Sequence, residues 1–420
     1  MPTFVKRTPI AAPAEDVFRW HARPGAFERL TPPWERVEVL ARSGGLEVGA
    51  RVTLRTSAGE WVAEHVECRE GRMFRDVQRQ GPFKRWDHRH LFEPDGDGCV
   101  LEDRIEYELP YGALGRAAAG RSTERRLERV FAWRHAVTAA DVVAHRGARP
   151  MKIALSGSSG LVGAALAPFL TTGGHEVLRL RRGEAPPEGV EALVHLAGEP
   201  IAQRWNEKVK AKVRDSRVEG TRALVAALPK SVKVFVSASA VGFYGSRGDE
   251  VLREDSAPGG DFLSEVCKDW EAAAAGAPGR SAFARFGVIL SPKGGALRKM
   301  LTPFKLGAGG RVGPGTQWMS WLSIEDAVGV LHHLLRQEIS GPVNAVAGAA
   351  TNRDFTRALG RALGRPTIFP MPAFAARLAF GEIADALLLA SQRVEPARLR
   401  GSGYAFRHPD LDGALAALLG

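Results

Sequence analysis

An apolar strand, a glycine-rich turn and an apolar helix follow one another directly at residues 152–170 of this 420-residue chain. The turn has the spacing Gly-x-x-Gly-x-x-Gly. In this context the first glycine permits the tight turn, the second lets a pyrophosphate approach the backbone, and the third lets the helix pack on the strand. The free N–H groups at the start of the helix then face the phosphates. The motif predicts a dinucleotide site at Gly157, Ser158, Gly160, Leu161, Val162 and Gly163, the alternative being an ordinary strand–turn–helix.

Strand and helix patterns continue to alternate after this turn. Strand candidates are 152–156, 176–180, 192–196, 232–237 and 281–286, with helical segments between them. This alternation is typical of a doubly wound parallel sheet covered by helices on both faces. The less regular chain after this point is expected to build a smaller lobe on the substrate side. We therefore predict an α/β Rossmann-type fold with a smaller C-terminal substrate lobe.

The end of the second predicted strand carries Arg181 and Arg182 where an NAD-binding site usually has an acid. The acid would bind the ribose 2′-hydroxyl, whereas a guanidinium pairs bidentately with a 2′-phosphate. The sequence thus predicts that NADP(H) is preferred over NAD(H). The alternative is that both arginines are simply solvated.

The chain before the internal Met151 follows a different pattern. A strand at 4–10 and a short helix after Pro13 precede several strand candidates, and a long helix spans 121–145. The strand candidates alternate apolar with polar residues and are separated by turn residues, at 37–40, 50–56, 61–67, 72–78, 84–92 and 100–109. A curved antiparallel sheet wrapped on one long helix is the α+β helix-grip plan, which we expect here.

Met151 marks the clearest boundary, because a short polar segment ending in Pro150 precedes it and an apolar strand follows. We predict a helix-grip domain at 1–147, a Rossmann domain at 151–365 and a C-terminal extension at 366–420. The linker between the first two is only a few residues long.

The first segment resembles the START-like, polyketide-cyclase-like superfamily (SRPBCC) over about residues 1–147. The likeness is carried mainly by residues 8–18 and 85–93. It implies a hydrophobic cavity between sheet and helix, and hence a small apolar ligand, but it implies no reaction. Several aromatic residues either line such a cavity or are simply core, namely Trp34, Trp61, Phe74 and Trp86.

The second segment, about residues 151–420, resembles atypical extended short-chain dehydrogenase/reductases (SDRs) of the nucleoside-diphosphate-sugar-epimerase-like group, the NAD-dependent epimerase/dehydratase family. Similar stretches lie at 195–201, 215–217, 237–245, 261–271, 285–295, 321–326 and 392–394. The resemblance implies that Leu196, Ala197 and Gly198 run beneath the cofactor. It also implies that Ser237 lies near the nicotinamide.

The chain departs from ordinary SDR chemistry, in which a Tyr-x-x-x-Lys pair transfers a proton and holds the ribose. If Lys268 is the lysine, Ser264 occupies the tyrosine position; alignment on Trp270 and Glu271 gives Leu263 and Cys267 instead. The tyrosine is absent in either case. The candidate catalytic residues are therefore Ser239, as a hydroxyl that holds a substrate carbonyl, and Lys268; a strand-end capping role for the serine stays open.

These features predict an NADP(H)-dependent oxidoreductase or epimerase acting on a small-molecule substrate, since hydride chemistry belongs largely to the cofactor. The missing tyrosine leaves open a non-catalytic NADP(H)-binding sensor or scaffold. The first domain leaves open a carrier of hydrophobic ligands.

Composition excludes several other classes. The net charge of +11 comes from basic residues interleaved with acids, so we expect no nucleic-acid partner. No apolar run approaches the ~20 residues that cross a bilayer, so no membrane span is expected. Cys68, Cys99 and Cys267 are too few and too widely spaced for a disulfide framework, which fits a reducing cytoplasm.

His88 and His90 share one strand face because they are two residues apart. No third ligand is near them in the sequence, so no metal site is expected. The sequence leaves the oligomeric state open.

Overall fold

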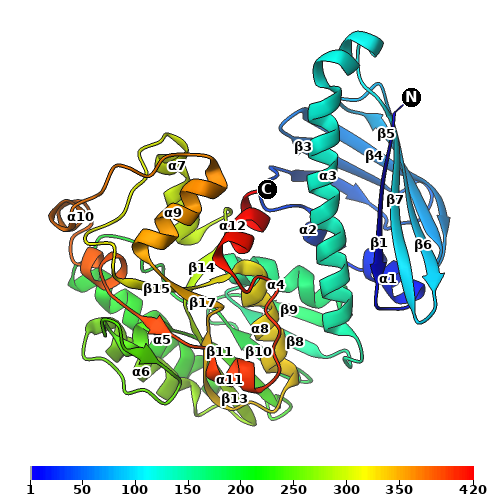
Figure 1. The fold of residues 1–420 in the computed structure, drawn as a ribbon. Helices are drawn as coiled ribbons and strands as arrows, with labels where there is room; N and C mark the ends of the chain where they lie inside the picture. Colours follow the sequence, from blue (N-terminus) through cyan, green and yellow to red (C-terminus); the bar gives the residue numbers. More distant parts are fainter. Residues whose placement is uncertain (1) are drawn as a thin grey trace. The chain divides into compact units, whose positions relative to one another are not determined.

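The computed structural model describes residues 2–420, which form two compact units that divide between Arg149 and Pro150 (Figure 1). Residues 2–149 belong to the first unit. The second contains Pro150–Leu170 and His175–Leu419.

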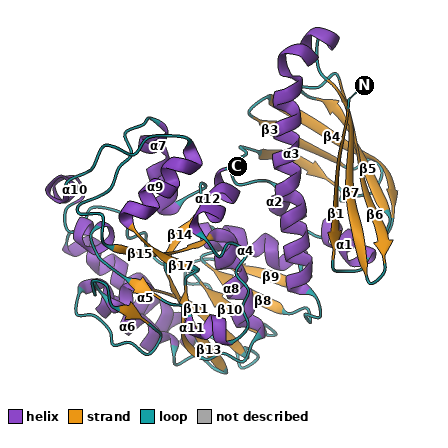
Figure 2. Cartoon of the chain, in the orientation of Figure 1, coloured by secondary structure: helices purple, strands orange, loops and turns teal. Residues whose placement is uncertain are grey.

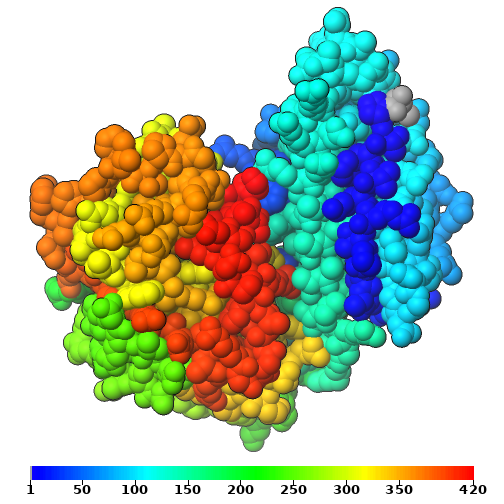
Figure 3. Space-filling model, in the orientation of Figure 1, coloured from blue at the N-terminus to red at the C-terminus, as the bar shows by residue number. Residues whose placement is uncertain are grey.

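The first unit is a seven-stranded antiparallel sheet in the order β1-β7-β6-β5-β4-β3-β2, curved around one long helix (Figures 1 and 2). Its strands are β1 (Thr3–Ile10), β2 (Glu38–Ser43), β3 (Arg51–Thr56), β4 (Gly59–Arg69), β5 (Met73–Gln80), β6 (Arg85–Asp95) and β7 (Gly98–Glu108). Its helices are α1 (Ala14–Ala22), α2 (Ala26–Leu30) and α3 (Gly112–His145). The predicted helix-grip plan is confirmed. The space-filling view shows β1 beside α3 at the surface of this unit (Figure 3).

The face of the sheet toward α3 follows the predicted alternation on β7. Leu101, Asp103, Ile105 and Tyr107 are buried there, whereas Arg104 between them is exposed. One carboxylate therefore lies among the apolar side chains of the core, and it needs partners to be stable there.

Aromatic side chains fill most of the space between α3 and the sheet. Phe74 and Trp86 are core residues, and Trp34 and Trp61 are half-buried against the same clusters. A recess in this region is too narrow to hold a water molecule, whereas ordinary ligand pockets have roughly 300–1,000 Å³. Its lining comprises His21, Leu30, His90, Leu101, Asp103, Arg134, His135 and Thr138, and most of the surface that these residues present to it is apolar. The structure thus shows a narrow recess, with ionisable side chains in its wall, at the position where the sequence predicts a hydrophobic cavity.

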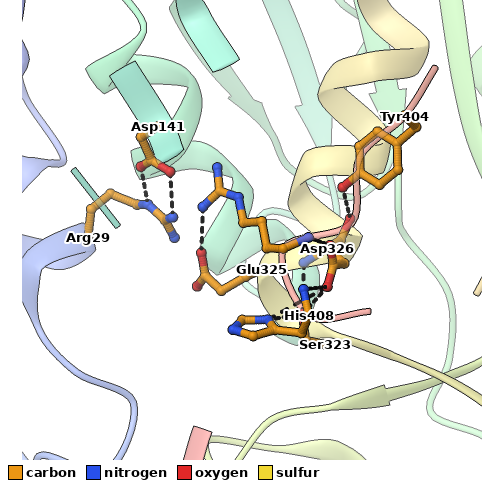
Figure 4. Close-up of polar contacts among 8 residues, drawn as sticks. Arg29, Asp141, Ser323, Glu325, Asp326, Tyr404 and His408 are labelled. Carbon is orange, nitrogen blue, oxygen red and sulfur yellow. Dashed lines mark hydrogen bonds and ion pairs between the residues drawn. The ribbon is translucent and has the colours of Figure 1, made fainter. Parts of the chain in front are cut away.

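A buried ion pair fastens α2 to α3 in this unit. Arg29 donates Nε to Asp141 Oδ2 at 2.7 Å and Nη2 to Oδ1 at 2.9 Å (Figure 4). Both side chains are buried, and the bidentate geometry satisfies the two charges together.

The second unit is built on a six-stranded parallel sheet in the order β16-β13-β11-β10-β8-β9. Its strands are β8 (Lys152–Ser156), β9 (Glu176–Leu180), β10 (Ala192–His195), β11 (Val234–Ala240), β13 (Arg280–Phe286) and β16 (Gly341–Ala345). Helices cover both faces, which confirms the predicted Rossmann-type fold (Figure 2). They include α4 (Leu161–Thr172), α5 (Glu207–Ala226), α6 (Phe262–Ala274) and α8 (Ile324–Arg336).

Local signals set the ends of these helices. The side chain of Asp261 accepts the backbone N–H of Ser264 and so caps α6. Ser323 caps α8 in the same way by accepting the N–H of Asp326. Each capping residue directly precedes a segment with the apolar spacing of an amphipathic helix, so the sequence pattern and the cap predict the same helix start.

A smaller lobe is built mainly from the chain after β13, together with η1 and β12 from the chain before it. It contains a three-stranded sheet in the order β14-β15-β17 and the two-strand pair β12-β18. Its elements are β12 (Val251–Leu252), β14 (Val288–Leu290), β15 (Trp318–Ser323), β17 (Gly348–Thr351), β18 (Arg393–Val394), α7 (Gly295–Lys305), α9 (Asn352–Leu363), α10 (Ala373–Phe380), α11 (Ala397–Gly401) and α12 (Leu411–Leu419), with a 3₁₀ turn η1 (Val241–Tyr244) and a π turn η2 (Ala384–Leu388).

The C-terminal segment is held to α8 through the buried Asp326 (Figure 4). Its carboxylate accepts the backbone N–H groups of Arg407 and His408 at 2.7 and 3.1 Å. Tyr404 donates its hydroxyl to the Asp326 carbonyl at 3.2 Å. The extension is thereby tied into the second unit, and the predicted boundary at residue 366 stays a prediction. Within residues 2–420, no helix has both the length and the apolarity needed to span a membrane.

Candidate cofactor and active site

The site predicted from the glycine turn lies at the switch point of the parallel sheet. The neighbours of β8 are β9 on one side and β10 on the other, so the chain leaves β8 toward one side and later returns to the opposite side. Ligands of open α/β sheets bind at such a point, outside the carboxyl ends of the strands. Ser156 of β8 pairs with His195 of β10 at this end.

Gly157 and Gly163 are required by the backbone at this turn. Gly157 has a φ of +73°, and a Cβ on it would lie 2.6 Å from the carbonyl carbon of Leu196 and 2.7 Å from the nitrogen of Ala197. A Cβ on Gly163 would lie 2.3 Å from the carbonyl oxygen of Gly157. The fold therefore brings the glycine turn directly against the predicted Leu196–Ala197 segment.

Gly160 is exposed, and a Cβ there would meet only the Gly157 oxygen, at 3.2 Å. Its open side thus has room for a ligand. Helix α4 begins at Leu161, so the N–H groups of Leu161, Val162 and Gly163 belong to its first turn. Such groups lack partners within the helix and are suited to bind phosphate.

The two arginines lie at the edge of the same end of the sheet. Leu180, the last residue of β9, pairs with Ser156, the last residue of β8. Arg181 therefore lies at the same level of the sheet edge as Gly157, the first residue of the glycine turn. The backbone N–H of Arg181 donates to Glu184 at 2.8 Å. Both side chains are exposed, and Arg182 has a long contact of 3.8 Å with Glu199. Both guanidinium groups are therefore accessible to an anion.

His195 is the last residue of β10, a central strand of the sheet, and both of its ring nitrogens form hydrogen bonds. Nδ1 lies 2.6 Å from Ser156 Oγ and Nε2 lies 2.9 Å from Thr221 Oγ1. Burial lowers the pKa of His195 to about 4. The ring is neutral near pH 7 and connects β8, β10 and α5.

Ser239 belongs to a buried polar network at the carboxyl end of the sheet. Its Oγ donates to Glu271 of α6 at 2.6 Å, and Arg285 donates twice to the same carboxylate, at 2.8 Å each. Arg285 also donates to the hydroxyl of Tyr244 at 2.9 Å, which in turn donates to Asn344 at 2.7 Å. All five side chains are buried.

Strand register produces this network. Ser239 of β11 pairs with Arg285 of β13, and Arg285 pairs with Asn344 of β16, so three polar residues form one row across the sheet. Burial lowers the pKa of Arg285, but Glu271 more than offsets this and the pKa is raised. Burial also raises the pKa of Tyr244. The network holds one ion pair and a neutral tyrosine.

The structure does not bring Ser239 and Lys268 together. Lys268 is exposed on α6, and no contact within residues 2–420 joins it to the serine. The face of α6 toward η1 carries Leu263 and Cys267, whose side chains lie 3.5 and 3.8 Å from a Cβ built on Gly242. Burial raises the pKa of Cys267 to about 12, so its thiol is protonated. A catalytic role for Lys268 stays a prediction.

Ser237 is buried, and its Oγ donates to the carbonyl of Ala238 at 3.0 Å. Sequence reasoning missed the partners of Ser239. Glu271 and Arg285 lie within stretches that resemble the SDR group, but only their pairing across the sheet shows that they act together. The signal that the sequence does contain is an acidic residue and a basic residue within two otherwise apolar segments, because such residues need partners when the segments are buried.

A doubly wound parallel sheet with a glycine turn and a helix N-terminus at its switch point defines an NAD(P)-binding Rossmann protein of the SDR class. The chain belongs to the NAD dependent epimerase/dehydratase family, whose sequence model matches residues 153–347. The Polyketide cyclase / dehydrase and lipid transport family matches residues 10–131, and a domain of unknown function, DUF1731, matches residues 371–418.

Relatives of the second unit occur in bacteria and animals. The chain is 43% identical over 288 residues to the epimerase family protein Mb2239 of Mycobacterium bovis, covering 63% of this chain and 96% of that protein. It is 36% identical over 293 residues to human SDR39U1, covering 64% and 100%.

Many solved structures are similar to this chain, and two of them are 36% and 35% identical to it. The nucleoside-diphosphate sugar epimerase of Corynebacterium glutamicum matches with a TM-score of 0.80 and 36% identity, over 99% of this chain and 90% of that one. The similarity therefore extends over both units. Human SDR39U1 (isoform 2) with NADPH matches with a TM-score of 0.61 and 35% identity, over 64% and 99%.

Proposed function

We propose that this chain is an NADP(H)-dependent oxidoreductase or epimerase that acts on a small-molecule substrate at the carboxyl end of the parallel sheet. The observation that carries the proposal is the glycine turn, with its φ of +73° at Gly157, placed against Leu196 and Ala197 and followed by the N-terminus of α4. A pyrophosphate fits this position for the physical reasons given above. The NADPH in the human relative supports the same cofactor here.

Preference for NADP(H) rests on Arg181 and Arg182, which are exposed beyond the end of β9. One bidentate charge-assisted contact contributes about 1.5–3 kcal/mol, or roughly 10- to 150-fold in Kd. Titrating NADPH and NADH into wild type and the double variant Arg181→Ala/Arg182→Ala, followed by nicotinamide fluorescence, tests this. We expect weaker NADPH binding in the variant and unchanged NADH binding. Equal affinities for the two cofactors in wild type would contradict the preference.

Turnover without the tyrosine requires that the cofactor supply the hydride, that the protein position the substrate, and that water or another side chain supply the proton. Ser237 and Ser239 lie on β11 near its carboxyl end and are the candidate hydroxyls for holding a carbonyl, although both donate to protein acceptors in this structure. The competing function is a sensor or scaffold that binds NADP(H) without turnover, which the absent Tyr-x-x-x-Lys pair favours. Turnover with NADPH on a panel of carbonyl compounds and nucleotide sugars separates the two. Tight cofactor binding with no turnover across the panel would favour the sensor.

The first unit is proposed to bind a small apolar ligand and to supply or sense the substrate of the second. Its match to a polyketide cyclase and lipid transport family supports an apolar ligand. Because the recess is narrow, such a ligand would have to displace side chains that line it, such as Leu30 or Leu101. Native mass spectrometry of the full chain after incubation with a lipid extract tests whether such a ligand binds. A bound ligand in a chain that shows no turnover would support the alternative function, a carrier of hydrophobic ligands.

A further inference from the structure

A cluster of histidines and carboxylates lies between the sheet and α3 in the first unit, apart from the nucleotide site. Asp76 of β5 pairs in register with His88 of β6, and His90 of β6 pairs with Asp103 of β7. Because β6 alternates, His88 and His90 lie on the same face. Three neighbouring strands therefore direct two rings and two carboxylates to one point.

The distances around Asp76 match those of a metal coordination shell. Asp76 Oδ2 lies 3.4 Å from His88 Nδ1 and 3.3 Å from His90 Nε2. One ligand atom from each of the three residues lies within 4.8 Å of the others. Ligands at roughly 2.0–2.1 Å from a tetrahedral metal are about 3.3–3.4 Å apart. The His90 contact also meets the geometry of a hydrogen bond, and both contacts have the spacing of adjacent ligands.

The opposite nitrogens of both rings point to a second carboxylate. His88 Nε2 lies 2.7 Å from Asp103 Oδ1, and His90 Nδ1 lies 2.6 Å from the same oxygen without hydrogen-bond alignment. The other oxygen of Asp103 lies 2.7 Å from His135 Nε2 of α3. A carboxylate behind a ligating histidine fixes the tautomer and ring orientation, and metal-binding histidines nearly always have such a partner.

Burial makes a cation favourable at this point. The side chains of His88, His90 and Asp103 are at most 8% exposed, and that of Asp76 is 15% exposed. Two carboxylates within a core require compensating positive charge, and the half-buried Arg134 supplies part of it through its attraction to both Asp103 and Asp76. His65 of β4, which pairs in register with Asp76, has a buried Nδ1 without a hydrogen-bond partner.

We propose that Asp76, His88 and His90 form a binding site for one divalent transition-metal ion, with Zn²⁺ as the expected ion, and that Asp103 orients the His88 ring through its hydrogen bond. Two imidazoles and one carboxylate are a ligand set that binds zinc and leaves a fourth position for a small ligand. This differs from the sequence expectation of no metal, because the third ligand comes from a neighbouring strand twelve residues away from His88.

Metal analysis of the intact, untagged chain tests the site. The protein is stripped with EDTA, titrated with Zn²⁺ by calorimetry, and measured for bound zinc by mass spectrometry after dialysis. We expect one zinc per chain. Asp76→Asn and His90→Gln should each lose bound zinc and weaken binding more than 100-fold. Asp103→Asn, which keeps all three ligands, should weaken it by about 10- to 100-fold.

Two matched variants serve as controls. His21→Gln removes a buried histidine whose ring lies 6.3 Å from that of His90 but which bonds the carbonyl of Val17. His333→Gln removes a half-buried histidine of the second unit whose ring is hydrogen-bonded to Ser402. Both should bind zinc as wild type does. No stoichiometric zinc in wild type, or equal zinc in Asp76→Asn and wild type, would overturn the proposal.

A measurement on wild type keeps the test decisive if the variants fail to fold. The X-ray absorption spectrum of the zinc-loaded chain should show two histidine ligands with oxygen in the remaining positions. Sulfur ligation or fewer than two histidines would refute the assignment. A purely structural hydrogen-bond network predicts no retained metal at all.

Discussion

Replacing Glu271 with alanine tests whether the buried network at the carboxyl end of the parallel sheet stabilises the second unit. Glu271 accepts hydrogen bonds from Ser239 at 2.6 Å and from Arg285 at 2.8 Å twice. The Arg285 side chain is 3% exposed, so its guanidinium would remain buried without its carboxylate. Removing one partner of a buried ion pair costs roughly 3–5 kcal/mol. Because Arg285 keeps its contact with Tyr244, we expect a loss of about 3 kcal/mol.

Two further variants separate the ion pair from the hydroxyl. Ser239→Ala removes one hydrogen bond to a charged group, so we expect a loss of about 1.5 kcal/mol. The double variant Glu271→Leu/Arg285→Met removes both charges and replaces them with apolar side chains of similar size. Replacing a buried pair in this way is often neutral. We therefore expect the double variant to be more stable than Glu271→Ala.

Hydrogen exchange followed by mass spectrometry is the suitable assay, because the chain has two units and a single unfolding transition is not expected. Peptides covering α6 and β13 report the free energy of opening of the second unit, and peptides covering β7 serve as an internal reference. A loss below about 1 kcal/mol for Glu271→Ala would refute the reasoning. So would a double variant less stable than the single one.

Three more outcomes are expected. Gly160→Val should abolish NADPH binding in a fluorescence titration, because a branched side chain would occupy the place of the pyrophosphate. Circular dichroism should show that the variant is folded. A folded variant with wild-type affinity would show that the cofactor binds elsewhere. Burial lowers the pKa of His195 from 6.5 to about 4. As the pH falls below 6.5, this histidine therefore becomes protonated in the unfolded chain before it does so in the folded chain. Acidification from pH 6.5 to 4 should thus reduce the free energy of unfolding by up to about 3 kcal/mol. His195→Asn should reduce this acid sensitivity, measured by hydrogen exchange of second-unit peptides at several pH values; equal pH dependence in variant and wild type would exclude His195 as the cause. Cutting the chain after Arg149 and comparing the pieces with the whole should abolish any effect of NADPH on ligand binding by the first unit, whereas pieces that reproduce every property of the intact chain would show that the fusion has no coupled function.

The sequence predicts the nucleotide half of the second unit closely. The predicted strands at 152–156 and 176–180 coincide with β8 and β9, and α4 begins directly after the glycine turn. These features are local, since an apolar run, a glycine at positive φ and a helix start are all encoded within about twenty residues. The same is true of Arg181, whose place at a strand end follows from the strand itself.

The helix-grip plan of the first unit is likewise contained in the alternation of its strands. What the alternation could not show is the content of the space beneath α3. The two-residue alternation of β7 places the side chain of Asp103 on the buried face. Its partners come from two other elements, β6 and α3, and are His88, His90 and His135. The predicted cavity is therefore a narrow recess whose wall includes a charged and hydrogen-bonded cluster.

The amino-acid sequence by itself determined the two folds, the position of the glycine turn and the family to which the chain belongs, because each depends on residues that are near one another in the chain. Only the tertiary structure decided which distant polar residues meet. Ser239, Glu271 and Arg285 come together through strand register and helix docking, as do Asp76, His88 and His90. Register and docking are set by burial of whole faces, so a short stretch of sequence does not contain them.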